Sequence, residues 1–240
     1  MQRILRPFET FGKTATNSVC IWLNGEPTAI EKRAEELWNG AKYRVAADGA
    51  LNEIEKRAET VEWPHVVAGD FDSKDERIET RNATIVHLPD QMKTDLTKSI
   101  EFCLEQNERK EWTFDRIVIL GGLNGRFDHT MSTLSTLAMF VAQSVPVFVL
   151  DSRNFLMAVP EGEMSVDVDL QICSKMCGVI PIAQTPTRVT SNGLKYEMTD
   201  LPLAFGHLIS SSNELAAERI QLKANAPLLF TIELISEHLQ

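Results

Sequence analysis

Short apolar runs alternate with stretches of helical spacing through the first 150 residues. The runs are bounded by turn residues, which predicts buried strands, and the stretches between them place apolar residues three and four positions apart, which predicts helices. The expected strands cover residues 18–25, 43–47, 66–68, 84–88, 116–120 and 145–150. The expected helices cover residues 28–38, 50–58, 75–81, 95–106 and 128–143. Strands that alternate with helices favour a parallel sheet with right-handed crossovers, so we predict an α/β domain with a Rossmann-like parallel sheet.

A different pattern follows this region, because apolar and polar residues then alternate with a period of two. Residues 164–172 and 228–234 show the alternation most clearly, and glycines mark turns between the short runs. The pattern is typical of antiparallel strands with one buried face, so we predict an all-β sandwich. Residues 1–17 show no clear pattern and are expected to form a loose N-terminal arm. The predicted domains are therefore the arm (1–17), the α/β domain (18–150) and the β-sandwich (151–240).

Charge narrows the range of partners. The chain of 240 residues carries 24 Lys and Arg against 34 Asp and Glu, which gives a net charge of −10. Nucleic-acid binders concentrate positive charge on one face, so we expect no nucleic-acid partner. A phosphate ligand would need a divalent cation between its oxygens and the carboxylates of the protein.

The cysteines and the apolar runs indicate in which cellular compartment the protein works. Of four cysteines, only Cys173 and Cys177 lie close in sequence, and their spacing indicates neither a zinc site nor a disulfide framework. No apolar run approaches the roughly 18 to 20 residues of a membrane span. Residues 1–13 lack the apolar centre of a secretory signal. We therefore expect a cytoplasmic protein without a membrane partner.

Acidic residues recur where predicted strands end or where the following helices begin. They are Asp48, Asp70, Asp72, Asp95 and Asp128. The carboxyl ends of parallel strands meet at one edge of a sheet, and open α/β sheets bind ligands there. Carboxylates gathered at that edge would repel one another, a cost that bound Mg2+ would offset. Asp70 and Asp72, directly after the buried run 66–68, fit the role of metal ligands best.

Each acid also has a structural explanation. Asp95 would stabilise the first turn of its helix, with Thr94 as the N-cap. Asp128 would serve as an N-cap, and Asp48 would belong to an ordinary turn. Taken singly, these explanations are as good as the functional one, whereas the paired acids after residues 66–68 favour function.

A glycine-rich segment follows the strand expected at 116–120. It reads Gly121-Gly122-Leu123-Asn124-Gly125-Arg126-Phe127-Asp128. Glycines let a backbone approach phosphate oxygens, the next helix start offers N–H groups, and Arg126 suits bidentate phosphate binding. The segment matches neither a Walker A loop nor a dinucleotide fingerprint. A plain strand-to-helix turn with a surface arginine explains the spacing equally well.

Two polar segments stand out in the predicted sandwich. The run Ser210-Ser211-Ser212-Asn213 groups small hydrogen-bonding side chains, and Tyr196 follows a turn at Asn192-Gly193. Such groups suit a heteroaromatic ligand through stacking and directed hydrogen bonds. Turn residues with a half-buried tyrosine are the more common explanation.

Several short motifs occur in a fixed order along both halves of the chain. They are Ala47-Asp48-Gly49, Gly69-Asp70-Phe71-Asp72-Ser73, Pro89-Asp90-Gln91 with Thr94-Asp95, Gly121-Gly122-Leu123, Gly125-Arg126-Phe127-Asp128-His129, Gly193-Leu194-Lys195 and Ser212-Asn213. In this order they resemble the motifs of the thiamine pyrophosphokinases, and the chain is similar to the animal members of that family. The Gly-Asp-Phe-Asp-Ser and Gly-Arg-Phe-Asp-His segments are specific together, although either alone is weak.

The resemblance implies an architecture and an activity. It implies a homodimer in which an α/β nucleotide-binding domain precedes a β-sandwich and thiamine binds between the subunits. The implied reaction transfers the β,γ-diphosphoryl group of ATP to the hydroxyl of thiamine, giving thiamine diphosphate and AMP. The implied substrates are ATP and thiamine, with Mg2+ as the cofactor.

The same resemblance implies a role for each motif residue. The metal ligands would be Asp70, Asp72 and Asp95, with Asp48 in the same acidic cluster. The ATP contacts would be Gly121, Gly122, Gly125, Arg126 and Asp128. The thiamine contacts would be Tyr196, Ser212 and Asn213. The implied catalytic set is Asp48, Asp70, Asp72, Asp95, Arg126 and Asp128, in which Asp48 and Asp128 are both open as the general base.

Three positions depart from the family pattern. Met92 stands where the family often has an acid, so that acid cannot be essential in an active enzyme. Tyr196 stands at a position where the animal enzymes resemble one another in having tryptophan. This replacement would weaken or reshape stacking on thiamine. Ala50 replaces a glycine.

Two other functions remain open. The acids and the glycine turn suit any Mg-ATP phosphotransferase on this scaffold, and formation of ADP instead of AMP would reveal one. The more distant alternative is a non-catalytic module that binds nucleotide or thiamine diphosphate and signals through dimer contacts. The departures at Met92 and Tyr196 are compatible with that hypothesis, and binding without turnover would favour it.

Overall fold

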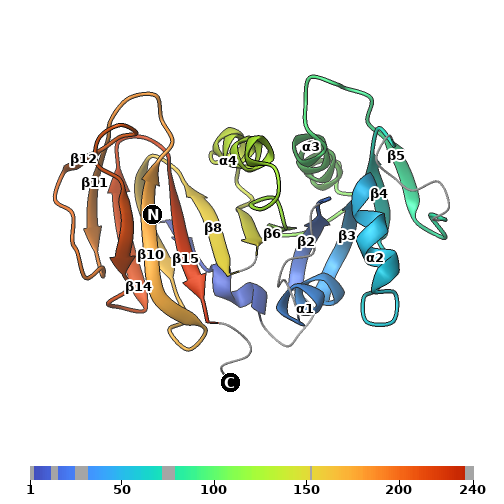
Figure 1. The fold of residues 1–240 in the computed structure, drawn as a ribbon, viewed down its shortest axis with the longest axis horizontal. Helices are drawn as coiled ribbons and strands as arrows, with labels where there is room; N and C mark the ends of the chain where they lie inside the picture. Colours follow the sequence, from blue (N-terminus) through green and yellow to red (C-terminus); the bar gives the residue numbers. More distant parts are fainter. Residues whose placement is uncertain (1–2, 12–15, 25–31, 72–78, 152, 236–240) are drawn as a thin grey trace. The chain divides into compact units, whose positions relative to one another are not determined.

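The computed structural model describes residues 3–11, 16–24, 32–71, 79–151 and 153–235 (Figure 1). The chain divides into two compact units. The α/β unit comprises Thr10–Thr136 and Val149–Ser152, and the β-rich unit comprises Met1–Glu9, Leu137–Phe148 and Arg153–Gln240. The domain boundary at residue 150 stays a prediction, because Leu137–Phe148 belongs to the β-rich unit and Val149–Ser152 to the α/β unit.

Six strands of the described chain form the sheet of the α/β unit. They are β2 (Thr16–Trp22), β3 (Ala41–Ala47), β4 (Val66–Gly69), β5 (Thr84–His87), β6 (Arg116–Leu120) and β7 (Val147–Asp151), whose end lies in this unit. Hydrogen bonding orders them β7-β6-β2-β3-β4-β5, and the pairs from β6 to β5 are parallel. Ile21 lies opposite both Val45 and Ile119, and all three are fully buried. The predicted parallel sheet is confirmed, and its apolar strands require cover on both faces.

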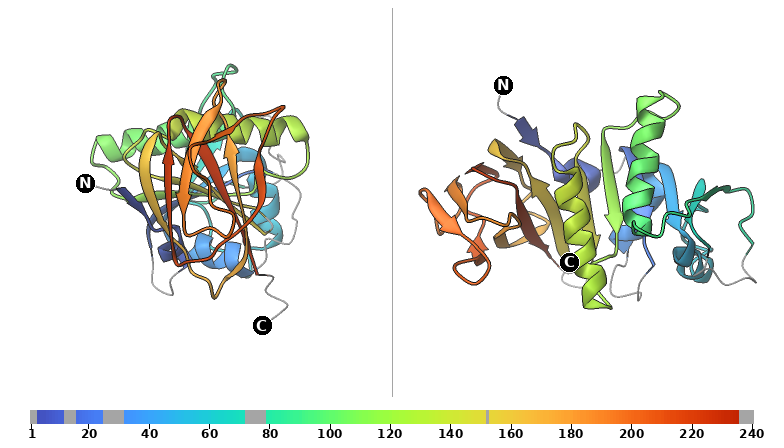
Figure 2. Two further views of the ribbon diagram at one scale, coloured as in Figure 1. Left: turned by 90° about the vertical axis from the view of Figure 1, so that its left-hand side faces the viewer. Right: turned by 90° about the horizontal axis from the view of Figure 1, so that it is seen from above.

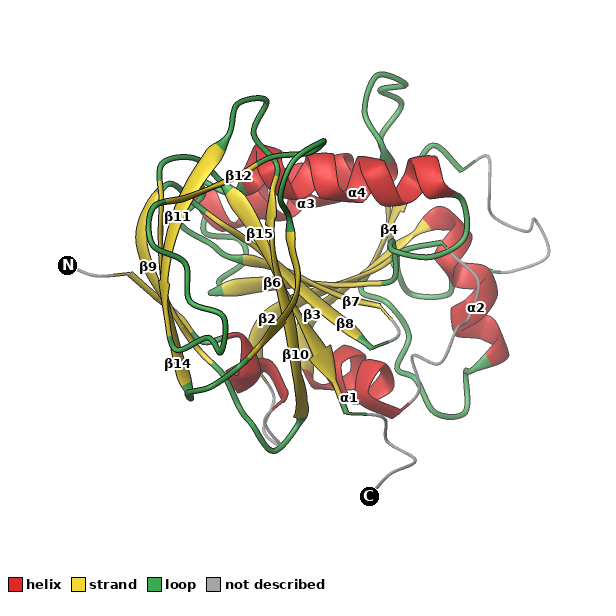
Figure 3. Cartoon of the chain, turned by 60° about the vertical axis from the view of Figure 1, so that its left-hand side comes forward, coloured by secondary structure: helices red, strands yellow, loops and turns green. Residues whose placement is uncertain are grey.

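Helices provide that cover. They are α1 (Lys32–Gly40), α2 (Leu51–Lys56), α3 (Asp95–Glu108) and α4 (Phe127–Phe140). The chain moves outward from β2 to β5 and then returns to β6, so right-handed crossovers place α1 and α3 on opposite faces of the sheet (Figure 3). On the α1 face, Trp38 packs edge-on against Trp22 with 5.2 Å between the ring centroids.

The helix boundaries follow local sequence signals. The Thr94 side chain accepts a hydrogen bond from the Thr97 backbone N–H at 3.3 Å, which confirms the predicted N-cap of α3. The helix expected over 50–58 is shorter, because the 3-10 turn η2 (Asp48–Ala50) precedes α2. The helix expected over 75–81 falls largely on residues outside the described part of the chain. Among the helices that the structure describes, none is long and apolar enough to cross a membrane.

The β-rich unit contains two sheets within the described residues (Figure 2). One has the order β1-β9-β14-β11-β12, and the other contains β13-β10-β15-β8. The strands are β1 (Arg3–Leu5), β8 (Asn154–Val159), β9 (Gly162–Asp167), β10 (Cys173–Pro181), β11 (Thr187–Asn192), β12 (Leu201–Leu203), β13 (Ser210–Glu214), β14 (Arg219–Ala224) and β15 (Leu228–Leu234). Antiparallel pairing dominates, which confirms the predicted all-β sandwich. The strand expected over 164–172 differs at both ends, since β9 begins at Gly162 and ends at Asp167.

The prediction of a loose arm over residues 1–17 is wrong for the part of that segment that the structure describes. Strand β1 pairs in parallel with β9 at the edge of a sheet. The 3-10 turn η1 (Pro7–Phe11) follows, and the Phe8 ring packs edge-on against the buried Phe155 ring at 5.5 Å. The sequence carries no local signal for this arrangement, because both partners lie far along the chain.

Candidate functional site

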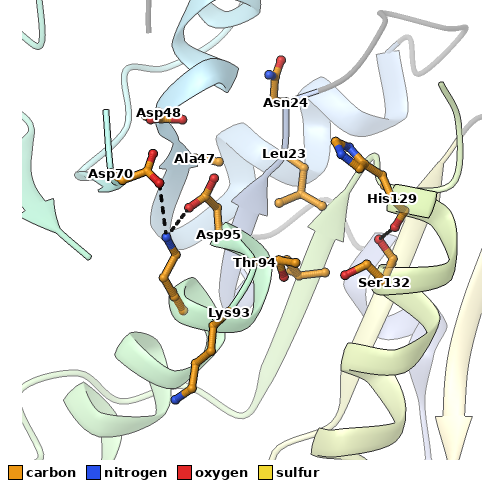
Figure 4. A pocket seen from close by; sticks show the side chains of 14 residues that line it. Leu23, Asn24, Ala47, Asp48, Asp70, Lys93, Thr94, Asp95, His129 and Ser132 are labelled. Carbon is orange, nitrogen blue, oxygen red and sulfur yellow. Dashed lines mark hydrogen bonds and ion pairs between the residues drawn. The ribbon is translucent and has the colours of Figure 1, made fainter. Parts of the chain in front are cut away.

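A pocket of about 270 Å3 lies at the carboxyl ends of the strands in the α/β unit. Its walls come from residues that follow β2, β3, β4 and β6 and from the starts of α3 and α4 (Figure 4). The polar lining includes Asp48, Asp70, Asp95, Lys98 and His129, and Gly122 also lines it. We call it the acidic pocket. The structure thus brings three of the candidate acids together at the edge where parallel strands place ligand sites.

Asp48 is buried, and Gly69 on the neighbouring strand leaves the space for its side chain. The parallel register of β3 and β4 pairs Ala47 with Ala68, which puts Asp48 beside Gly69. A Cβ built on Gly69 would lie 2.9 Å from Asp48 Cγ, closer than non-bonded carbon atoms normally approach. Asp48 Oδ1 accepts a hydrogen bond from the Gly49 N–H at 2.6 Å. The glycine of the Gly-Asp-Phe-Asp motif therefore makes room for the Asp48 carboxylate.

Asp70 and Asp95 point toward one buried ammonium group. The Nζ of Lys98 lies 2.7 Å from Asp95 Oδ1 and 4.0 Å from Asp70 Oδ2. Figure 4 marks the two ion pairs by dashed lines that start at the Asp70 and Asp95 carboxylates. The Lys98 side chain is 5% exposed, and its Nζ also donates a hydrogen bond to the Leu88 carbonyl at 2.9 Å. Asp70 Oδ2 accepts a further hydrogen bond from Gln91 Nε2 at 2.9 Å. The ammonium offsets the repulsion between the two carboxylates.

The residue that follows Asp70 has a constrained backbone. Phe71 has a φ of 68°, in the left-handed region that bulky side chains rarely adopt. Its ring stacks on the His87 ring with 6.2 Å between the centroids. Strained backbone of this kind gathers at binding sites. Asp72, the second acid of the motif, lies outside the described residues.

Positive φ angles shape the glycine-rich loop, which we define as residues 121–126. Gly121, Gly122 and Gly125 have φ angles of 88°, 93° and 76°, which glycine adopts without steric cost. A Cβ on Gly122 would also lie 2.9 Å from a side-chain atom of Leu23. Both the backbone and the available space therefore require glycine at position 122.

Arg126 and Asp128 lie on the surface at the start of α4, outside the set of residues that lines the acidic pocket. Arg126 Nη2 donates to Asp128 Oδ2 at 2.5 Å, and the two side chains are 71% and 64% exposed. The hydrogen bond from Arg126 lowers the pKa of Asp128 below its usual value, and the same bond raises the pKa of Arg126. A lower pKa makes a carboxylate a weaker proton acceptor, so Asp128 is a poor general base while this pair is intact.

The three residues expected at thiamine lie together in the β-rich unit. Asn213 is 2% exposed, its Nδ2 donates to the Tyr196 carbonyl at 2.8 Å, and its Oδ1 accepts from the Tyr196 N–H at 3.0 Å. Tyr196 is 57% exposed, more than the half-buried tyrosine of the structural explanation, and Ser212 is exposed as well. The buried amide of Asn213 therefore fixes the backbone that presents the Tyr196 ring.

The oxygen donors of the acidic pocket suit a hard cation. Mg2+ is usually held by one or two protein carboxylates together with substrate phosphates, and Asp70 and Asp95 offer two. Within the described ranges, no group of three His, Cys, Asp or Glu residues could hold a metal ion by protein ligands alone. The carboxylates of Asp70 and Asp95 suit a cation that is shared with a phosphate ligand.

Comparison with known proteins identifies the family. The sequence models described as "Thiamin pyrophosphokinase, catalytic domain" and "Thiamin pyrophosphokinase, vitamin B1 binding domain" match residues 34–149 and 163–229. The protein named thiamin pyrophosphokinase 1 of Caenorhabditis elegans is 59% identical over 98% of this chain and 96% of its own. The chain belongs to the thiamin pyrophosphokinase family.

Solved structures of the family share the fold. Thiamin pyrophosphokinase from Candida albicans superposes with a TM-score of 0.85 at 22% identity, covering 98% of this chain and 93% of its own. The yeast thiamin pyrophosphokinase gives a TM-score of 0.84 at 18% identity, covering 99% and 92%. These structures confirm the α/β and β-rich architecture of the thiamin pyrophosphokinases for this chain.

The structure shows why two departures from the family pattern, Met92 and Ala50, leave the acidic pocket and its backbone intact. Met92 is 93% exposed and lies outside the lining of the acidic pocket, so the pocket acids do not depend on position 92. Ala50 is fully buried with a φ of −68°, a conformation that any residue adopts, so its backbone does not require glycine.

Lys98 is a pocket residue that the sequence pattern did not single out. It lies three positions after Asp95 in α3, so the two residues share one face of the helix. An acid and a lysine at this spacing, at a helix start that follows a strand, form the signal that could have identified it. His129, the last residue of the Gly-Arg-Phe-Asp-His motif, also lines the pocket.

We expect Lys98→Met to lower the free energy of unfolding by about 1–3 kcal/mol, because it leaves partly buried carboxylates without the donor that satisfies them. The matched control is Lys93→Met. Lys93 also pairs with a carboxylate, that of Glu101, but the Lys93 side chain is 40% exposed and the Glu101 side chain 41%. Surface pairs contribute little, so the control should leave the free energy of unfolding nearly unchanged. Urea denaturation measures both values, and equal effects of the two substitutions would contradict the role of Lys98.

Proposed function

We propose that this protein transfers the diphosphoryl group of ATP to the hydroxyl of thiamine, giving thiamine diphosphate and AMP. The observation that carries this assignment is the 59% identity with the C. elegans thiamin pyrophosphokinase 1 over nearly the full length of both chains. The acidic pocket supports it, because phosphoryl transfer depends on positioning and charge neutralisation more than on covalent help from the protein.

We place Mg2+ at Asp70, Asp72 and Asp95. The convergence of the Asp70 and Asp95 carboxylates on Lys98 supports this placement, because it puts two oxygen donors on one side of the pocket. When bound, Mg2+ would neutralise phosphate charge as the AMP leaves. Lys98 orients the same carboxylates and places an ammonium group beside them.

The ATP phosphates are placed at the glycine-rich loop, with Gly121, Gly122, Gly125, Arg126 and Asp128 as contacts. Gly122 lines the acidic pocket, and a Cβ built on Gly125 would meet no described heavy atom within 4 Å, which leaves room for a ligand. Arg126 is exposed, so it can exchange its hydrogen bonds to Asp128 for bonds to a phosphate without unfolding any packed structure.

Asp48 is the better candidate for the general base. It lines the acidic pocket, whereas Asp128 lies at the surface with a pKa that Arg126 lowers. The proton that leaves the thiamine hydroxyl would therefore pass to a carboxylate next to the proposed metal ligands.

Thiamine is placed at Tyr196, Ser212 and Asn213 of the β-rich unit, at the interface of a homodimer. The exposed Tyr196 ring suits stacking on a heteroaromatic ring, and the buried Asn213 amide holds it in place. The unit also exposes the large apolar side chains of Phe205 and Leu208. The four cysteines are free thiols, which supports a reducing cytoplasmic compartment.

The product assay tests the function directly. Purified protein is incubated with ATP, Mg2+ and thiamine, and the nucleotides and thiamine phosphates are separated. Thiamine diphosphate with an equal amount of AMP supports the proposal. ADP with thiamine monophosphate would indicate an ordinary kinase, and tight binding without turnover would indicate a regulatory module.

Removal of a metal-binding charge should reduce catalysis strongly. We expect Asp70→Asn and Asp72→Asn each to lower kcat by at least about a hundredfold at saturating Mg2+, because a charged metal contact contributes several kcal/mol. Asp115→Asn is the control, since Asp115 is an exposed acid beside the amino end of β6 and should retain normal turnover. Near-normal kcat of either variant at saturating Mg2+ would remove that residue from the metal site.

The homodimer gives a separate prediction. Sedimentation equilibrium should report about twice the chain mass of 27.0 kDa.

Tyr196→Ala should raise the KM for thiamine and leave the KM for ATP unchanged, because the ring contacts only thiamine in the proposed complex. A monomer with full activity would contradict thiamine binding between subunits.

A further inference from the structure

Asp151 is a buried carboxylate at the carboxyl end of β7, in the α/β unit, and none of the sequence motifs includes it. Its side chain is nearly inaccessible, with 1% of the residue exposed. Its Oδ2 accepts a hydrogen bond from the Leu123 backbone N–H at 2.6 Å, and its Oδ1 accepts one from Asn124 Nδ2 at 2.8 Å. Both donors belong to the glycine-rich loop. One carboxylate thus binds the backbone and a side chain of two consecutive loop residues.

A second contact ties the same loop to the same strand. The Gly121 N–H donates to the Leu150 carbonyl at 2.9 Å. Strand β7 therefore holds the loop at its first residue through Leu150 and in its middle through Asp151. The loop contains three glycines, which leave an unrestrained chain with many conformations and a large entropy to lose on ordering.

The negative charge of Asp151 makes this anchor effective. Hydrogen bonds to an ionised acceptor are shorter and stronger than bonds between neutral groups. A buried carboxylate is tolerated only when such donors satisfy it, so the loop and the acid stabilise each other. An asparagine of the same shape is neutral, so its bond to the Leu123 N–H would be weaker, and it could bond Asn124 only if that amide turned its oxygen toward the new NH2 group.

We propose that Asp151 is a positioning residue for the nucleotide: it holds the glycine-rich loop in the conformation that receives the ATP phosphates. This inference rests on the proposed placement of those phosphates at the loop. Asp151 does not contact ATP, because its two oxygens are directed to Leu123 and Asn124. Its contribution is to order Gly121, Gly122 and Gly125 before the ligand arrives, which lowers the cost of binding.

The contact between Asp151 and Asn124 allows a test by exchange. Asp151→Asn removes the charge and so weakens both loop bonds, and Asn124→Asp places two carboxylates against each other. The double variant Asp151→Asn/Asn124→Asp restores both bonds, because Asn at 151 can accept from the Leu123 N–H and donate to Asp at 124. The double variant also carries the same net charge as the wild type, so it separates the geometry of the bonds from the charge.

We expect each single variant to raise the KM for ATP at least about tenfold, which corresponds to about 1.4 kcal/mol, and to leave the KM for thiamine within about twofold. The double variant should return the KM for ATP to within about threefold of wild type. Calorimetric titration with ATP in the absence of thiamine should show the same order of affinities. Thermal unfolding of every variant checks that the fold is intact.

Three results would overturn the inference. They are an unchanged KM for ATP in Asp151→Asn, equal changes in the KM values of ATP and thiamine, and a double variant no better than the single ones. If Asp151→Asn does not fold, Asn124→Ala removes one loop contact without burying a new charge and should still raise only the KM for ATP. Failure of the wild type to form AMP would reject the proposed function instead, whereas an active wild type with an unaffected Asp151→Asn rejects this inference alone.

Discussion

Parallel pairing of the strands is the constraint on which the site depends. Because β2, β3, β4 and β6 run in the same direction, the segments that follow them meet at one edge of the sheet. Residues that are far apart in the sequence, such as Asp48, Asp70 and Gly122, therefore line a single pocket. The same geometry concentrates negative charge, and the protein must offset the resulting repulsion locally.

Each acid near this edge has a different environment, and its neighbours determine its role. Asp48 is buried in space that Gly69 leaves open, and Asp70 shares the Lys98 ammonium with a second carboxylate. Asp151 is directed to backbone and side-chain donors of the glycine-rich loop. Asp128 is paired with an arginine at the surface. Acids with similar positions at strand ends or helix starts thus divide into those that face the pocket, one that orders a loop and one that pairs outside it.

The β-rich unit uses a buried polar group in a comparable way. Asn213 is nearly inaccessible, and its amide binds both the N–H and the carbonyl of Tyr196. The tyrosine ring remains exposed while its backbone is fixed, which suits a stacking contact that must be ready before the ligand binds. In both units, a satisfied buried group orients an exposed or flexible segment, and such groups carry little signal in the sequence.

Elements with a local pattern could be predicted from the sequence. Strands 116–120 and 228–234 have the predicted limits, since a continuous or alternating apolar run reports burial directly. The motifs also sufficed to indicate the family. Only the tertiary structure revealed the pairing of β1 with β9, the position of Lys98 between two acids and the contact of Asp151 with the glycine-rich loop. These features depend on which partner a residue meets, and periodicity along the chain reports which face is buried but not what lies against it.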